Sequence, residues 1–226
     1  HTILLHGLGQ PPASWDAVLA AWTPASPLLR PGLAELLQAG EARYDRLYEA
    51  FSALCAELPG PLDLCGLSLG GVLALHYAAD HPDRVGRLVL IGAQYVMPKR
   101  LLRVQSLLFR CMPESSFRGM GLPKRDVLSL TGSMAELDFR AALPKIPCPA
   151  LVVCGERDKA NRQAAQELAE GLPNAELRIL PGAGHEVNVD APQALAELLS
   201  DFLDGPAWCA LIRRNPPPPK DGGARI

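Results

Sequence analysis

The chain has 226 residues, of which 48% are hydrophobic and 20% are charged, with a formal net charge of −2. This length supports one sizeable buried core with room for a small appendage, and the charge gives no overall attraction to nucleic acid or to a membrane surface. The apolar runs are far shorter than the roughly 20 residues of a membrane span, and no leader pattern is visible. We therefore expect a cytoplasmic protein without stable membrane insertion and without nucleic acid as a partner.

Short apolar runs alternate with longer helical patterns along the chain, which is typical of βαβ units and a parallel sheet. The predicted strands are 2–6, a weakly signalled 28–29, 62–66, 86–92, 150–154 and 176–180. The last of these alternates in polarity, as a strand near the edge of a sheet does. The predicted helices are 41–58, 69–81, 162–171 and 191–203, where apolar residues recur at three- and four-residue spacing.

The rhythm changes between residues 95 and 146, where helical stretches broken by prolines replace the strand pattern and basic residues outnumber acidic ones. We predict a helical cap at 95–146, inserted into an α/β core made of 1–94 and 147–204. One cap helix is expected at 99–112, with an apolar face that packs on the core and a basic face on the other side. A sharper hypothesis is that the basic face attracts anionic or membrane-bound substrates. Residues 205–226 are rich in proline and glycine, which predicts an extended or disordered tail.

The six cysteines are scattered, without a C-x-x-C pair or a zinc-like histidine spacing. Cys65 and Cys154 fall inside predicted strands, where a free thiol behaves as a small hydrophobic group. We expect reduced thiols in a reducing compartment and no bound metal.

Residues Gly66-Leu67-Ser68-Leu69-Gly70 form a G-x-S-x-G motif directly after a predicted strand and at the start of a predicted helix. In this context the serine sits on a strained strand-to-helix turn, with its hydroxyl exposed above the sheet. The alternative is an ordinary glycine-rich turn. We predict that Ser68 is a nucleophile.

A serine nucleophile needs a base, and the base needs an acid that holds the correct tautomer. His185 follows the last predicted strand in a glycine-rich loop, and Asp158 follows the strand that ends at Cys154. The order Ser68, Asp158, His185 is the one expected for a G-x-S-x-G hydrolase of this type. Glu156 and Asp190 are competing candidates for the acid.

The tetrahedral intermediate of acyl transfer needs backbone donors for its oxyanion. The residue after the nucleophile supplies one, which is the N–H of Leu69. The turn His6-Gly7-Leu8-Gly9, after the first strand, is expected to supply the second from Leu8.

Together these four motifs resemble the α/β-hydrolase family, and within it the small capped esterases and carbon–carbon bond hydrolases. The resemblance covers residues 2–203 and implies an acyl pocket between cap and core. The chain lacks the antiparallel hairpin that usually precedes the first strand and the glycine-rich stretch usual near Arg30. It carries Leu67 where relatives often have a histidine or an aromatic residue. None of these departures removes a catalytic group.

The predicted function is hydrolysis of a small carboxylic ester through an acyl-enzyme on Ser68, without a cofactor. A thioesterase or a carbon–carbon bond hydrolase with the same triad is one alternative, and a non-catalytic ligand-binding member of the fold is another. Dehalogenase and epoxide-hydrolase chemistry is disfavoured, because those relatives place aspartate at the nucleophile position. The sequence leaves the oligomeric state open.

Overall fold

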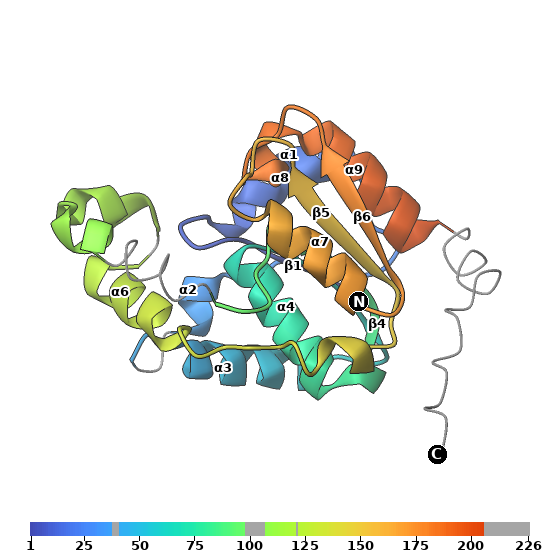
Figure 1. The fold of residues 1–226 in the computed structure, drawn as a ribbon, viewed down its shortest axis with the longest axis horizontal. Helices are drawn as coiled ribbons and strands as arrows, with labels where there is room; N and C mark the ends of the chain where they lie inside the picture. Colours follow the sequence, from blue (N-terminus) through green and yellow to red (C-terminus); the bar gives the residue numbers. More distant parts are fainter. Residues whose placement is uncertain (38–40, 98–106, 121, 206–226) are drawn as a thin grey trace, which may run out of the picture.

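The computed structural model describes residues 1–37, 41–97, 107–120 and 122–205. At its centre lies a six-stranded sheet with the order β2-β1-β3-β4-β5-β6, in which every described pairing is parallel (Figure 1). The strands are β1 Thr2–Leu5, β2 Leu28–Leu29, β3 Leu62–Leu67, β4 Val85–Ile91, β5 Ala150–Gly155 and β6 Ala175–Leu180. All six predicted strands are confirmed, including the edge position of the last.

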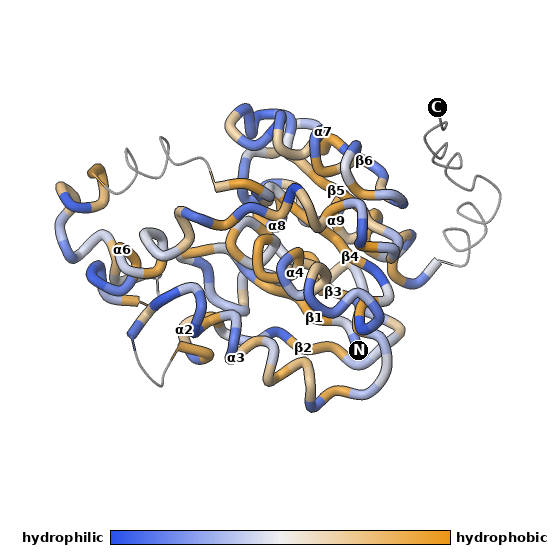
Figure 2. Tube along the Cα trace, turned by 60° about the horizontal axis from the view of Figure 1, so that its bottom comes forward, coloured by the Kyte–Doolittle hydropathy of each residue, from blue (hydrophilic) through white to orange (hydrophobic). Residues whose placement is uncertain are grey.

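The central strands are buried on both faces, which explains their continuous apolar sequences. Every residue of β1 and β5 is buried, and Figure 2 shows the hydrophobic stretches gathered along the inner strands. Cys65 and Cys154 are free thiols with no exposed surface, as predicted for core strands.

Alternation along the strands sends side chains to two separate cores. Leu64 and Leu88 face a core completed by α3, α4 and α7, whereas Cys65 and Val89 face a core completed by α1 and α9. The helices are α1 Asp16–Leu19, α2 Leu33–Leu36, α3 Tyr44–Ala56, α4 Leu69–Asp80, α6 Lys124–Ser133, α7 Arg162–Gly171, α8 Val187–Asp190 and α9 Pro192–Leu199. The chain is therefore a three-layer α/β/α structure.

Two predicted helices differ from the structure at their ends. The helix predicted at 41–58 begins only at Tyr44, because Arg43 is extended, with φ −123° and ψ 152°. The helix predicted at 191–203 is α9 followed by a π-helical turn, Ser200–Asp204. The helices predicted at 69–81 and 162–171 match α4 and α7.

The segment predicted to form the cap contains short helices joined by turns where the structure describes it. Residues 107–111 are helical, and a 3-10 stretch Glu114–Met120, α6 and a 3-10 turn Leu143–Lys145 follow. Figure 1 shows α6 beside the layers that cover the sheet, and Leu130 and Met134 join the core of α3 and α4. The helix predicted at 99–112 lies mostly outside the described residues, as does nearly all of the predicted tail, 206–226.

Candidate active site

The predicted site residues follow four parallel strands, so they gather at one edge of the sheet. The turn at Leu8 follows β1, Ser68 follows β3, Asp158 follows β5 and His185 follows β6. Strand ends fixed by the core thus bring together residues that are distant in sequence.

Ser68 lies in a strained turn between β3 and α4. Its φ of 53° and ψ of −115° make it the only non-glycine residue with positive φ in the described part of the chain. Such a conformation costs about 1–3 kcal/mol and persists only where the surroundings impose it. Here the Ser68 N–H donates to the Ile91 carbonyl at 2.8 Å, and the Ser68 carbonyl accepts from the Val72 N–H at 3.0 Å. One bond extends the pairing of β3 with β4 and the other begins α4.

The two glycines of the motif permit a close approach of backbones. A methyl group at Gly66 would lie 2.2 Å from the Gly70 carbonyl oxygen, and one at Gly70 would lie 2.4 Å from the Leu5 carbonyl oxygen. Both separations are impossible for a real side chain, so the turn can form only with glycine at these positions.

His185 and Asp158 form a hydrogen-bonded pair. His185 Nδ1 donates to Asp158 Oδ2 at 2.8 Å, and the aspartate side chain is 5% exposed against 41% for the histidine. Burial acts to raise the pKa of Asp158, but hydrogen bonds from His185 and Asn161 outweigh it and hold this pKa below its ordinary value. The hydrogen bond to Asp158 in turn raises the pKa of His185, against the effect of burial. The pair therefore has the arrangement of a base with its orienting acid.

Gly92, at the end of β4, brings Ser68 and His185 to the same place. The Ser68 N–H bonds to Ile91, and a methyl group on the next residue, Gly92, would lie 3.0 Å from His185 Nδ1. Within the described residues no hydrogen bond joins Ser68 Oγ to His185. Such contacts are often long before a substrate is bound, so this geometry is compatible with a nucleophile and its base.

The two competing acids bind backbone groups of the loop that carries His185. Glu156 Oε2 accepts from the Gly182 N–H at 2.8 Å, and Asp190 Oδ2 accepts from the Gly184 N–H at 2.6 Å. Both carboxylates shape the loop, while Asp158 contacts the imidazole itself.

The Leu8 and Leu69 N–H groups have no acceptor among the described residues. Leu69 is the first residue of α4, where the helix dipole favours negative charge. Leu8 lies in a turn closed by a 3.1 Å bond from the Gln10 N–H to the Gly7 carbonyl. Leu69 directly follows Ser68 in the chain, and a methyl group at Gly7, next to Leu8, would lie 3.5 Å from Ser68 Cβ, so both free donors lie near the serine.

Gln10 links this turn to the His185 loop, a role that the sequence did not reveal. Its Oε1 accepts from the Gly7 N–H at 3.3 Å, and its Nε2 donates to Glu186 at 3.1 Å and to Asn188 at 3.2 Å. Asn188 is fully buried and also donates to the Ser14 carbonyl at 3.1 Å. The amide network connects the donors beside Ser68 to the residues that follow the histidine.

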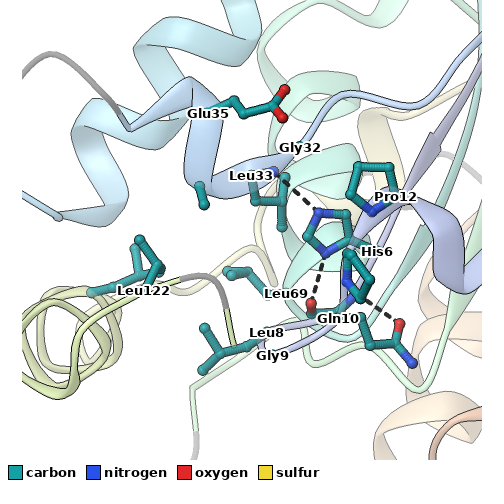
Figure 3. A pocket seen from close by; sticks show the side chains of 14 residues that line it. His6, Leu8, Gly9, Gln10, Pro12, Gly32, Leu33, Glu35, Leu69 and Leu122 are labelled. Carbon is teal, nitrogen blue, oxygen red and sulfur yellow. Dashed lines mark hydrogen bonds between the residues drawn. The ribbon is translucent and has the colours of Figure 1, made fainter. Parts of the chain in front are cut away.

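A cavity of about 300 Å³ opens beside Leu8 and Leu69. Leucine and proline side chains form most of its wall, and Figure 3 shows Leu122 across it from His6 and Pro12. Among the described residues it has no lysine or arginine in its lining, and Glu35 is its one acidic side chain. An apolar cavity next to two backbone donors suits an acyl chain or an alcohol group.

His6 supports the turn and takes no part in the pair. Its Nε2 accepts from the Leu33 N–H at 3.1 Å and its Nδ1 donates to the Gly7 carbonyl at 2.9 Å. Burial lowers the pKa of His6 and so favours the neutral ring. A neutral ring is what these contacts require, because one nitrogen accepts a hydrogen bond while the other donates one. The ring therefore ties the turn after β1 to the start of α2.

No group of three or more potential metal ligands occurs among the residues that the structure describes. Within the same ranges, no helix is long and apolar enough to cross a membrane.

Comparison with known proteins gives a consistent family. A family model described as "Alpha/beta hydrolase family" matches residues 2–198. The pimeloyl-[acyl-carrier protein] methyl ester esterase of Aromatoleum aromaticum is 28% identical, over 90% of this chain and 98% of that protein. A 2-hydroxy-6-oxononadienedioate/2-hydroxy-6-oxononatrienedioate hydrolase of Paraburkholderia phymatum is 29% identical, over 62% of this chain and 61% of that protein.

Among solved structures, the enol-lactonase of Burkholderia xenovorans LB400 has the same fold, with a TM-score of 0.78 and 22% identity over 90% of each chain. Leu8, Ser68, Asp158 and His185 all lie within the matched residues, 2–198. The chain is a hydrolase that belongs to the α/β-hydrolase family.

Proposed function

We propose that this protein hydrolyses small, uncharged carboxylic esters through an acyl-enzyme on Ser68. The observation that carries the proposal is the 2.8 Å bond between His185 and the buried Asp158, beside a serine held in a strained turn. A histidine with a buried carboxylate on Nδ1 keeps its Nε2 free to accept a proton.

The proposed reaction has two halves. Ser68 Oγ attacks the ester carbonyl while His185 takes its proton, and the Leu8 and Leu69 N–H groups stabilise the oxyanion. His185 then gives the proton to the leaving alcohol. A water molecule, deprotonated by His185, releases the acid and restores Ser68. Asp158 stays ionised and stabilises the imidazolium.

The cavity favours esters over the carbon–carbon bond substrate named for the Paraburkholderia relative, which is a dianion. Glu35 is the single charged carboxylate of the described lining, and no cation stands near it there to bind a substrate carboxylate. Methyl esters of acyl chains, the class named for the Aromatoleum relative, are uncharged at the reacting end. Their alkyl part matches the leucine-lined wall.

The test is a panel of neutral, cationic and anionic p-nitrophenyl esters of rising chain length, with Ser68→Ala as the reference. We expect turnover of the neutral esters that Ser68→Ala lacks. Ester turnover no faster than that of Ser68→Ala, in folded protein, would contradict the proposal. Cleavage of a dienedioate substrate with no ester turnover would instead support the carbon–carbon bond alternative.

A further inference from the structure

Asn161 contacts both members of the His185–Asp158 pair. Its Nδ2 lies 2.9 Å from Asp158 Oδ1 and 2.8 Å from Oδ2, and its backbone N–H lies 3.3 Å from Oδ1. The same Nδ2 is 3.1 Å from His185 Nδ1. Since Asp158 is an acceptor, the amide N–H and the imidazole N–H converge on one carboxylate.

The environment makes these donors important. The Asp158 side chain is 5% exposed, so water contributes little to its solvation. A buried carboxylate keeps its charge only when protein donors replace water. Among the described residues, His185 and Asn161 are its side-chain donors.

Gln94 stabilises the Asn161 amide in the orientation that donates to Asp158. If the Asn161 amide were reversed, its oxygen would face the carboxylate of Asp158, and this repulsion sets the direction of the amide. Gln94 Nε2 donates to Asn161 Oδ1 at 2.7 Å, which adds a second hydrogen bond in that direction.

Gln94 lies where the chain leaves the sheet. It lies shortly after β4 and just before Val96, which forms an isolated antiparallel bridge with Asp138. The chain at this point leaves the sheet for the segment predicted to be the cap. The hydrogen bonds therefore run from the exit of β4, through Asn161, to the acid.

We infer that Gln94 and Asn161 are positioning residues: Asn161 fixes the orientation of the Asp158 carboxylate and takes up part of its charge, and Gln94 acts only through Asn161. Neither residue exchanges a proton with a substrate. Their effect is on the orientation of Asp158 and on how much of its charge acts on His185. The inference deepens the proposed function and rests on it where turnover is measured, but the His185 pKa can be tested without turnover.

Removing Asn161 donors leaves more of the Asp158 charge to interact with protonated His185. We therefore expect the pKa of His185 to rise by about 0.5–1 unit in Asn161→Leu, which keeps the branched shape of the side chain. Gln94→Leu should raise it by less, because Asn161 is then free to rotate but still present. In the double variant the pKa should equal that of Asn161→Leu alone.

The experiment is an NMR titration of the His185 imidazole, assigned with His185→Gln, in the two single variants and the double variant. Gln163→Leu is the matched control, because Gln163 lies on the exposed side of α7 and bonds to Glu167. Thermal unfolding of each variant checks that it is folded. The smaller replacement Asn161→Ala checks that a shift of the pKa does not come from altered packing around the leucine. The control should leave the His185 pKa unchanged.

An unchanged or lowered His185 pKa in folded Asn161→Leu and Asn161→Ala would overturn the inference. Additive shifts in the double variant would overturn the part assigned to Gln94. If an ester is turned over, the loss of kcat/KM in Asn161→Leu should grow as the pH falls, whereas a merely structural role predicts the same loss at every pH. An absence of turnover, with the expected pKa shifts present, would refute the proposed function and leave the positioning role of Gln94 and Asn161 standing.

Discussion

Gly92 packs against the ring of His185, so closely that a methyl group at position 92 would lie 3.0 Å from Nδ1 and 3.1 Å from Cε1. Gly92 also has a positive φ of 53°, which disfavours other residues. We expect Gly92→Ala to lose about 1–2 kcal/mol of stability from backbone strain and about tenfold to a hundredfold in kcat from displacement of His185. Urea unfolding and ester kinetics measure the two effects.

Gly60→Ala is the matched control for strain. Gly60 also has a positive φ, of 71°, but a methyl group there would meet no atom within 4 Å. This variant should lose stability and keep its kcat. Equal losses of kcat in the two variants would show that Gly92 does not act through His185.

The pH dependence of kcat/KM follows from the environment of His185. The hydrogen bond to Asp158 raises the pKa of His185 above its ordinary value of 6.5, and burial opposes this only in part. Protonated imidazole cannot accept the Ser68 proton, so activity should rise with pH through an apparent pKa above 6.5 and then level off. Initial rates with a neutral ester between about pH 5 and pH 9 test this. A midpoint below 6.5 would contradict a pKa of His185 raised by its bond to Asp158.

Glu35 should make the cavity disfavour negatively charged substrates. Replacing it as Glu35→Gln is expected to raise kcat/KM for an anionic ester about two- to fivefold and to leave a neutral ester unchanged. Added salt should remove the difference, because Glu35 is exposed and its field is screened. Glu49→Gln, on the exposed surface of α3, is the control. Identical effects of the two substitutions would mean that Glu35 does not face the substrate.

Asn188 should stabilise the junction between the Leu8 turn and the His185 loop. Asn188→Leu leaves the Ser14 carbonyl and part of the Gln10 amide without partners, which we expect to cost about 2–3 kcal/mol in urea unfolding. Asn174→Leu removes a single bond to the Pro147 carbonyl near the surface and should cost less than about 1 kcal/mol. Similar losses in both variants would contradict the role given to the buried amide.

The parts of this site that sequence could predict are those tied to strand ends. Ser68, Asp158 and His185 each follow a predicted strand, and parallel strands bring such positions to one edge of the sheet. The need for glycine at positions 66 and 70 could also be predicted, because the motif requires a close approach of two backbone segments. The choice among Asp158, Glu156 and Asp190 as the acid required the structure. Asp158 contacts the His185 ring, whereas the other two carboxylates accept hydrogen bonds from backbone N–H groups.

The residues that support the site gave no comparable signal. Gln94 and Asn161 lie 67 residues apart, and Gln10 and Asn188 lie 178 residues apart, so their amide pairs follow from tertiary packing alone. The cavity wall near Leu33 and Glu35 comes from a short helix in a stretch rich in proline and glycine, where no periodic pattern predicts structure. Helix ends at Arg43 and Ser200 were likewise decided by local backbone geometry.

The central claim is that Ser68 is a nucleophile activated by His185. The most direct measurement is reaction with a fluorophosphonate probe, followed by mass spectrometry of the labelled peptide. We predict one adduct on Ser68, formed at least about a hundredfold more slowly in His185→Ala. Well-folded protein with no adduct on Ser68, or labelling of His185→Ala at the rate of the unchanged protein, would contradict this account.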